Sequence, residues 1–255
     1  MTLDVVFTPA GLAASEVQGR VVFVVDILRA TTTICAALHH GARAVIPVAS
    51  TEEAMRLSQT LGADDILLAG ERGAVRIPGF ALGNSPREMV PEVVRGRSLI
   101  LTTTNGTGAL LAVSGGARVY LAAGVNFALV AERIRAAWLA GDQILVVCAG
   151  REQRFGLDDA YTAGRLVHAA LGGGRGRKGI NDAALAALEL VRRYGTRWER
   201  PLTSSQAGRD LIRSGFRDDV ADAARPDAYP VLPLFSDRRI TAAPASESSD
   251  TSSTP

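Results

Sequence analysis

Runs of apolar, mostly β-branched residues alternate with helical patterns from the N-terminus to about residue 171, and this alternation constrains the fold most. The runs lie at residues 3–7, 21–27, 44–48, 66–69, 98–102, 119–122 and 144–148. Strands that alternate with helices form parallel βαβ units, whose ligands bind at the carboxyl ends of the strands. We therefore predict an α/β fold with a mainly parallel layered sheet, helices on both faces and a ligand site at the strand carboxyl ends.

Most of the segments beyond residue 171 belong to the same domain, and the last ones form a tail outside it. Helices are predicted at residues 182–194 and 204–213, and a late strand at residues 229–235. Residues 172–178, rich in Gly and Arg, predict a flexible connector. The Ser-, Thr- and Pro-rich residues 242–255 predict a disordered tail, so residues 1–241 form one domain.

Composition excludes several classes of function. The 28 Lys and Arg residues nearly balance the 26 Asp and Glu residues, which argues against nucleic-acid and membrane partners. The two cysteines, Cys35 and Cys148, lie far apart and predict neither a disulfide framework nor a zinc site. No signal peptide and no apolar run of about 18 residues is visible, so we expect a cytoplasmic protein.

The first candidate site lies where the apolar run at residues 21–25 passes into a helical pattern. Asp26 and Arg29 follow the run, and three hydroxyl residues, Thr31, Thr32 and Thr33, open the helix. A helix start directs free N–H groups at an anion, most simply a phosphate. We interpret Asp26 as a metal ligand and Arg29 as a phosphate clamp. The alternative is a structural ion pair of Asp26 with Arg29 beside an ordinary helix cap.

Three later segments carry further candidate residues. Glu71 and Arg72 follow a strand and suggest a second metal ligand or base and a second anion contact, with a surface salt bridge as the alternative. A loop of about a dozen residues then reaches Asn84 and Ser85, and loops of that length in a compact domain are usually functional. The stretch at residues 102–107 repeats the threonine triplet before a helix, although an Asn-Gly turn with a cap would look the same.

A fourth segment follows the run at residues 144–148. Gly150 ends that strand, and Asp158 and Asp159 open the next helix, where the helix dipole favours acids in any case. We interpret one of them, Asp158, as a further oxygen ligand for Mg²⁺. Cys148 and Arg154 also match the C-x5-R spacing of cysteine-dependent phosphatases, although the residues between them are poor in the small side chains of such a loop.

Taken together, these motifs resemble the 2-phosphosulfolactate phosphatase (ComB-like) family. The resemblance covers nearly all of residues 1–235, and the order of the motifs matches as well as their content. It is carried by the segments at residues 25–33, 70–73, 77–86, 102–107, 148–150, 157–159, 205–208 and 215–220. It implies an α/β fold and a Mg²⁺-dependent phosphomonoesterase that acts on small 2-phospho acids, a step that serves coenzyme M synthesis in methanogens.

The predicted reaction is the hydrolysis of (2R)-2-phospho-3-sulfolactate to 3-sulfolactate and phosphate, assisted by Mg²⁺ held by Asp26 with Glu71 or Asp158. Arg72 or another loop arginine would hold the substrate's carboxylate or sulfonate. The predicted catalytic residues are Asp26, Arg29, Glu71 and Asn105. The predicted phosphate- and substrate-binding residues are Thr31, Thr32, Thr33, Arg72, Asn84, Ser85, Thr103, Thr104, Gly106, Thr107 and Gly150.

Three alternatives remain open at this level. The chain is a phosphatase of another three-carbon phospho acid, a metal-free phosphatase that depends on Cys148, or a non-catalytic sensor of phosphorylated acids. In each case the expected partner is a small phosphorylated acid, and the sequence leaves homo-oligomerisation open.

Overall fold

The computed structural model describes residues 1–61, 65–172 and 178–244. Within these residues ten strands form one sheet in the order β1-β8-β2-β7-β9-β10-β3-β6-β4-β5. The strands are β1 (Thr2–Val6), β2 (Val21–Val25), β3 (Ala44–Pro47), β4 (Ile66–Arg72), β5 (Val75–Arg76), β6 (Ser98–Thr102), β7 (Arg118–Ala122), β8 (Gln143–Cys148), β9 (Pro233–Ser236) and β10 (Arg239–Ala242).

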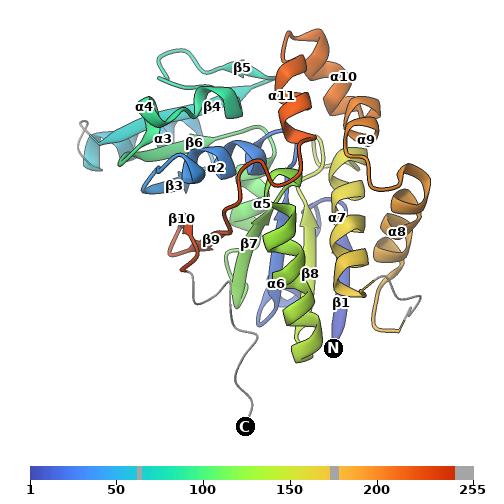
Figure 1. The fold of residues 1–255 in the computed structure, drawn as a ribbon. Helices are drawn as coiled ribbons and strands as arrows, with labels where there is room; N and C mark the ends of the chain where they lie inside the picture. The colour runs from blue at the N-terminus through green and yellow to red at the C-terminus, as the bar shows by residue number, and fades with distance from the viewer. Residues whose placement is uncertain (62–64, 173–177, 245–255) are drawn as a thin grey trace.

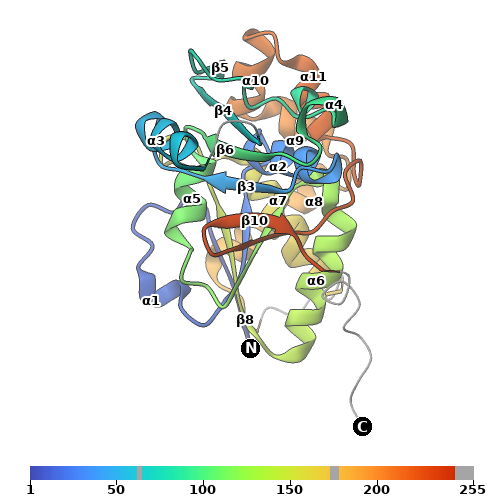
Figure 2. The same ribbon diagram turned by 90° about the vertical axis from the view of Figure 1, so that its left-hand side faces the viewer.

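Helices pack on both faces of the sheet. They are α1 (Ala14–Val17), α2 (Ala30–His39), α3 (Thr51–Leu61), α4 (Pro91–Val94), α5 (Gly106–Ala112), α6 (Phe127–Ala140), α7 (Leu157–Ala170), α8 (Asp182–Tyr194), α9 (Glu199–Ser204), α10 (Gln206–Arg213) and α11 (Arg217–Ala223), with short 3₁₀ turns η1 (Pro86–Glu88) and η2 (Gly124–Asn126). Figure 2 shows α1 and α5 on one side of β8, and α6, α7 and α8 on the other. The predicted α/β fold is thus confirmed.

The sheet consists of two parallel groups joined by an antiparallel hairpin. Strands β1, β8, β2 and β7 pair in parallel, and so do β3, β6 and β4. The hairpin of β9 and β10 lies between the groups, because β9 pairs with β7 and β10 pairs with β3, both antiparallel. Figures 1 and 2 show the strands of the two groups running at a steep angle to one another.

Strand β2 is buried on both faces, as its unbroken apolar run predicts. Val21, Phe23 and Val25 belong to one hydrophobic core, and Val22 and Val24 belong to another on the opposite face. Successive side chains of a strand point to opposite faces, so a strand between two helical layers requires apolar residues at every position. This packing fixes the position at which β2 ends, and therefore the position of the polar residues that follow.

Several C-terminal elements differ from the sequence prediction. The predicted late strand at 229–235 begins only at Pro233, and the helix predicted at 204–213 is divided by Ser205, whose side chain caps α10 by accepting from Gly208 N. Helix α11 and strand β10 were not predicted, since seven and four residues give too short a periodic pattern. The predicted connector falls mainly on residues 173–177 and the predicted tail mainly on residues 245–255, which lie outside the described residues.

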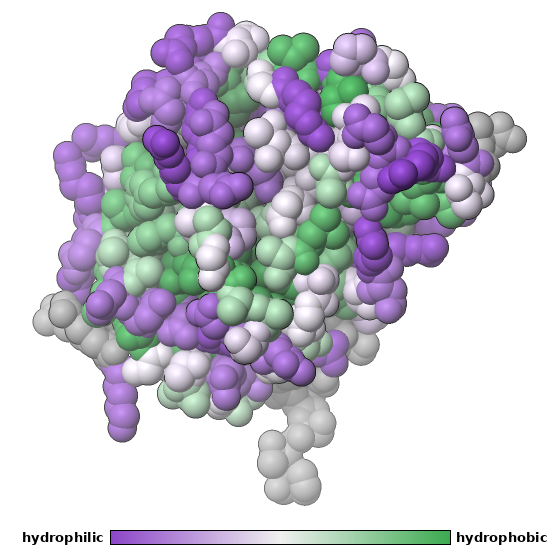
Figure 3. Space-filling model, turned by 180° about the vertical axis from the view of Figure 1, so that it is seen from behind, coloured by the Kyte–Doolittle hydropathy of each residue, from purple (hydrophilic) through white to green (hydrophobic). Residues whose placement is uncertain are grey.

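The surface mixes polar and apolar side chains. In Figure 3, the face turned away from the viewer in Figure 1 carries hydrophobic residues across its middle and hydrophilic residues around much of its margin. Scattered exposed apolar residues are normal on a folded domain. Across the described parts of the chain, no helix is long and apolar enough to cross a membrane.

Candidate active site

A cavity of about 170 Å³ lies where strands of both parallel groups end. Asp26 follows β2, Glu71 lies near the end of β4, Thr103 follows β6 and Gly150 follows β8. The predicted site residues that line the cavity are Asp26, Arg29, Glu71, Asn84, Thr103, Thr104, Asn105, Gly150 and Asp158. Further lining residues come from the loop after β8, from the first turn of α7 and from α10 and its C-terminal cap, namely Arg151, Glu152, Asp159, Ala207, Asp210, Leu211 and Ser214.

The first threonine triplet does not line the cavity. Its hydroxyls donate to backbone carbonyls: Thr31 to Asp26 O at 2.8 Å, Thr32 to Ile27 O at 2.8 Å and Thr33 to Asn84 O at 3.0 Å. Buried hydroxyls that already donate in this way fix the turn between β2 and α2. The structure therefore gives these hydroxyls a structural role in the turn, and their predicted contact with phosphate stays a prediction.

The residues of the second threonine-rich stretch either cap the helix or line the cavity, and Thr103 does both. Thr103 and Thr107 cap one another, because Thr107 N donates to Thr103 Oγ1 at 3.1 Å and Thr103 N donates to Thr107 Oγ1 at 3.3 Å. Thr103 and Thr104 line the cavity, whereas Thr107 does not. Gly106 also lies outside the lining: a Cβ there would come within 2.6 Å of Asp26 Oδ2. Glycine at this position lets the start of α5 approach the Asp26 carboxylate closely.

Glu71 and Asp159 use both carboxylate oxygens to hold backbone segments. Glu71 accepts from Ala74 N at 2.8 Å, Thr104 N at 2.8 Å and Thr104 Oγ1 at 3.1 Å. Asp159 accepts from Ile27 N at 2.9 Å and Gly150 N at 3.0 Å. These two acids therefore tie the loops after β2, β4, β6 and β8 around the cavity.

Asp26 and Asp158 do not tie loops together as Glu71 and Asp159 do. Asp26 accepts one backbone hydrogen bond, from Ala30 N at 3.2 Å. Burial raises the Asp26 pKa from 3.8 to about 7; the Ala30 N–H lowers it, the charges of Asp158 and Glu71 raise it further, and Arg29 lowers it. Burial likewise raises the Asp158 pKa to about 6, against opposing backbone amides and Arg151. A nearby cation would relieve this penalty for both acids.

The metal-free protein is expected to lose about 2–4 kcal/mol of unfolding free energy between pH 5 and pH 8. The Asp26 pKa is higher in the fold than in the unfolded chain, so its stabilising contribution is complete below about pH 4 and is lost as pH rises through about 7. Denaturant unfolding in a chelator measures the profile, and Asp26→Asn should flatten it. Stability that instead rises over this range would contradict the prediction.

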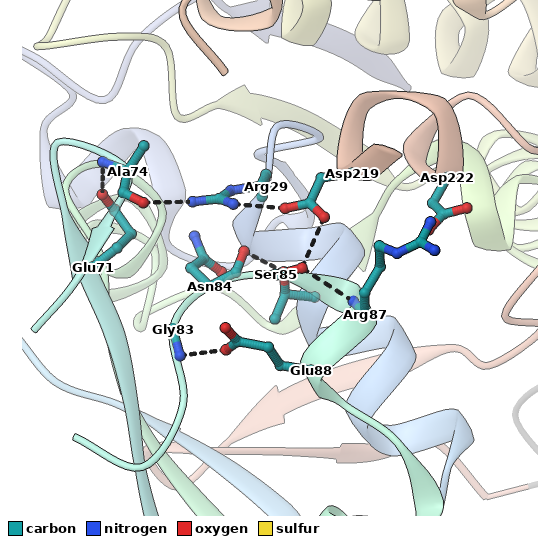
Figure 4. A network of polar contacts seen from close by, with 11 residues as sticks. Arg29, Glu71, Ala74, Gly83, Asn84, Ser85, Arg87, Glu88, Asp219 and Asp222 are labelled. Atoms are coloured by element: carbon teal, nitrogen blue, oxygen red, sulfur yellow. Dashed lines mark hydrogen bonds and ion pairs between the residues drawn. The ribbon is translucent and has the colours of Figure 1, made fainter. Parts of the chain in front are cut away.

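Arg29 is held by a buried network that reaches the C-terminal helices (Figure 4). Its Nη1 donates to Asp219 Oδ2 at 2.6 Å, and its guanidinium lies 4.3 Å from the centre of the Phe216 ring. Ser85 Oγ donates to the other Asp219 oxygen at 2.7 Å. The ion pair that the sequence suggested between Asp26 and Arg29 is thus wrong in its partner. Ser85 lies outside the cavity lining and orients Asp219.

Asp219, which holds Arg29 in place, is a residue to which the sequence analysis assigned no role. It is 2% exposed and lies in the first turn of α11, 190 positions after Arg29. Acids in a first helical turn are common for reasons of the helix dipole alone. The one available signal was its place in the motif at residues 215–220, which gave no partner.

Arg72 and Asn84 lie differently with respect to the cavity. Arg72 donates to Thr102 Oγ1 at 3.0 Å and to Glu71 O at 2.8 Å, and it does not line the cavity, so its predicted contact with the substrate is corrected to a structural one. Asn84 lines the cavity, and its buried Oδ1 has no hydrogen-bond partner among the described residues. An unpaired buried acceptor at a cavity wall indicates a missing donor, such as a ligand or a water molecule.

The described lining of the cavity is strongly acidic. It contains the carboxylates of Asp26, Glu71, Glu152, Asp158, Asp159 and Asp210. Against them stand two arginines, Arg29 and Arg151, and each is paired with an aspartate. An anionic ligand would be repelled from this cavity unless a cation accompanied it.

The donor set fits Mg²⁺ bound together with a phosphate. No cluster of three or more His, Cys, Asp or Glu side chains able to hold a metal by itself occurs within residues 1–61, 65–172 and 178–244. Mg²⁺ usually takes one or two carboxylates, several waters and phosphate oxygens of the substrate, so it does not require such a cage. The raised pKa values of the buried Asp26 and Asp158, two carboxylates that line the cavity, suit this kind of site.

Comparisons with known proteins identify the family. The family model described as 2-phosphosulpholactate phosphatase matches residues 6–238. A protein of Symbiobacterium thermophilum named "Probable 2-phosphosulfolactate phosphatase" is 40% identical over 227 residues, 89% of this chain and 96% of its own length. A protein of the same name from Caldanaerobacter subterraneus subsp. tengcongensis is 45% identical over 223 residues, 86% of this chain and 88% of its own length. The chain belongs to the 2-phosphosulfolactate phosphatase family.

Proposed function

We propose that the protein is a Mg²⁺-dependent phosphatase that hydrolyses the phosphomonoester of a small 2-phospho acid, 2-phospho-3-sulfolactate. Membership of a phosphatase family and the names of the relatives support the reaction and the substrate. The negative charge of the cavity is the observation that supports a requirement for Mg²⁺. Buried acids line a site that has to accept a phosphate dianion, so a cation is needed between them.

In this proposal Asp26 and Asp158 hold the Mg²⁺ ion. When bound, the ion would neutralise charge on the phosphoryl oxygens and supply a water of lowered pKa. Glu71 and Asp159 keep the four loops in place and thereby position the two ligands. Phosphoryl transfer asks mainly for positioning and charge stabilisation, which a fixed arrangement of this kind supplies.

Two asparagines and Arg29 surround the place proposed for the phosphate. Asn105 Oδ1 accepts from Glu152 N at 3.0 Å, which fixes the amide and leaves Nδ2 to donate to a phosphoryl oxygen. Arg29 contributes the N–H groups that remain after Nη1 donates to Asp219 and Nη2 donates to Ala74 O. Asn84 Oδ1, which has no partner among the described residues, would accept from a water molecule, since a phosphate dianion offers no donor.

Cys148 is poorly placed for a covalent route. It is fully buried and does not line the cavity. Burial, together with the charges of Asp159 and Asp158, holds its pKa well above the usual value, so the thiol stays protonated and is a weak nucleophile. These facts favour the metal-assisted reaction over the cysteine alternative.

Phosphate release from 2-phospho-3-sulfolactate, 2-phospholactate and 3-phosphoglycerate tests the function, with each compound assayed in Mg²⁺ and in EDTA. We expect release that requires Mg²⁺, is fastest with 2-phospho-3-sulfolactate and survives Cys148→Ala. Release that persists in EDTA and disappears in Cys148→Ala would instead establish the cysteine route. Tight binding of one compound without release in Mg²⁺ would establish a sensor.

A further inference from the structure

The loop after β8 presents Arg151 at the cavity on a fixed backbone. Gly150 N donates to Asp159 Oδ2 at 3.0 Å, and Glu152 N donates to Asn105 Oδ1 at 3.0 Å. Arg151 and Arg154 also exchange backbone hydrogen bonds, at 2.9 and 2.8 Å. Gly150 has a φ of 65°, and a Cβ there would lie 2.3 Å from Arg154 O, so this turn requires glycine. The backbone on both sides of Arg151 is therefore anchored to the site.

The side chain of Arg151 keeps freedom that Arg29 lacks. Arg29 is 3% exposed, paired with a buried aspartate and stacked on an aromatic ring. Arg151 is 36% exposed, and its Nη1 pairs with Asp210 of α10, which is itself 23% exposed. Of the two arginines in the described cavity lining, Arg151 is thus the one that can exchange its aspartate for a ligand with little loss of free energy, because partly exposed ion pairs contribute little.

Asp210 would keep other hydrogen-bond donors if Arg151 moved from it to a ligand. Its carboxylate also pairs with Arg213, and Gln206 Nε2 donates to it at 2.9 Å. An acid with three donors can release one of them without an uncompensated charge. Helix α10 contributes the uncharged Ala207, Leu211 and Ser214 to the same lining, so it offers no other acid to repel an anionic substituent.

We infer that Arg151 is the specificity residue that binds the sulfonate of the substrate. On binding, Arg151 releases Asp210, which stays paired with Arg213 and Gln206. This rests on the proposed function, in which Asp26 and Asp158 place the phosphate end of a three-carbon acid through the metal. The sulfonate is the third anionic group of that acid. Arg72 lies outside the cavity and the free N–H groups of Arg29 are assigned to the phosphate, so Arg151 remains to receive the sulfonate. A guanidinium donates two parallel hydrogen bonds to such an oxyanion.

The test compares the unaltered protein and Arg151→Gln on two substrates, one with the sulfonate and one without it. 2-Phospholactate differs from 2-phospho-3-sulfolactate only by the absence of the sulfonate. In Arg151→Gln we expect kcat/KM for the sulfonated compound to fall about 10- to 100-fold, mainly through KM, and kcat/KM for 2-phospholactate to change less than about 3-fold. Arg209→Gln is the matched control, because Arg209 belongs to the same helix α10 but is exposed and does not line the cavity; it should change neither value more than about 2-fold.

A second variant tests the exchange of partners. Asp210→Asn removes the charge that competes for Arg151, so 3-sulfolactate should bind more tightly as a product inhibitor, by about 3- to 10-fold. Equal losses on both substrates in Arg151→Gln, or no loss on either, would overturn the inference while leaving the phosphatase reaction intact. If the unaltered protein releases phosphate from neither compound in Mg²⁺, the proposed function itself fails and the inference fails with it.

Discussion

Asp26→Asn is expected to lower kcat by about 10³-fold in saturating Mg²⁺, the largest effect on activity among these predictions. The amide cannot supply the negative charge that the proposed metal site requires. Its oxygen can still accept from Ala30 N, the one backbone hydrogen bond that Asp26 accepts, so the turn should keep its geometry. Phosphate release measured at several Mg²⁺ concentrations separates a weakened metal site from a damaged fold.

The same variant should be more stable than the unaltered protein in a chelator at pH 8, because a neutral amide avoids the burial penalty that raises the Asp26 pKa. Loss of activity with gain of stability is typical of a charged functional site. Asp65→Asn serves as the control, since Asp65 is 69% exposed and pairs with Arg43 on the surface. A variant at Asp26 that keeps kcat within tenfold would exclude this carboxylate from the reaction.

Asp219→Ala is expected to cost about 3–5 kcal/mol of unfolding free energy, the largest effect on stability. The substitution leaves the guanidinium of Arg29 buried without its charged partner and removes the acceptor of the Ser85 hydroxyl. Removal of one partner from a buried ion pair costs much more free energy than the intact pair contributes to stability. The reason is that the remaining charge stays desolvated. Denaturant unfolding with a two-state fit measures the loss.

Its matched control lies one position away. Asp218 belongs to the same helical turn but is 71% exposed and reaches Arg87 only at 3.7 Å. Asp218→Ala should therefore stay within about 0.5 kcal/mol of the unaltered protein. If Asp219→Ala cost no more than Asp218→Ala, Arg29 would not depend on Asp219 for its charge balance.

The positions of the site residues along the strands were predictable. The apolar runs that became β2, β4, β6 and β8 end where the chain turns polar, so Asp26, Glu71, Thr103 and Gly150 could be placed at one edge of a sheet. This succeeds because buried strands require apolar residues at every position, and the requirement ends abruptly at the sheet edge.

The partners of these residues were not predictable. The hydroxyls of Thr31, Thr32 and Thr33 suit a phosphate as well as a backbone carbonyl, and only the folded turn decides between them. Arg29 meets Asp219 across 190 positions, a pairing that no local pattern encodes. Sequence periodicity describes which face is buried, but it does not say which distant side chain completes a polar network.

The hairpin of β9 and β10 has a consequence for how the chain is made. During synthesis both parallel groups emerge from the ribosome before the strands that join them, because β9 begins at Pro233 and Ile240 pairs with Val45 of β3. Until then β7 and β3 each present an unpaired edge, the kind of surface on which nascent chains associate wrongly. The architecture therefore delays the joining of the two parallel groups until residue 240 has been translated.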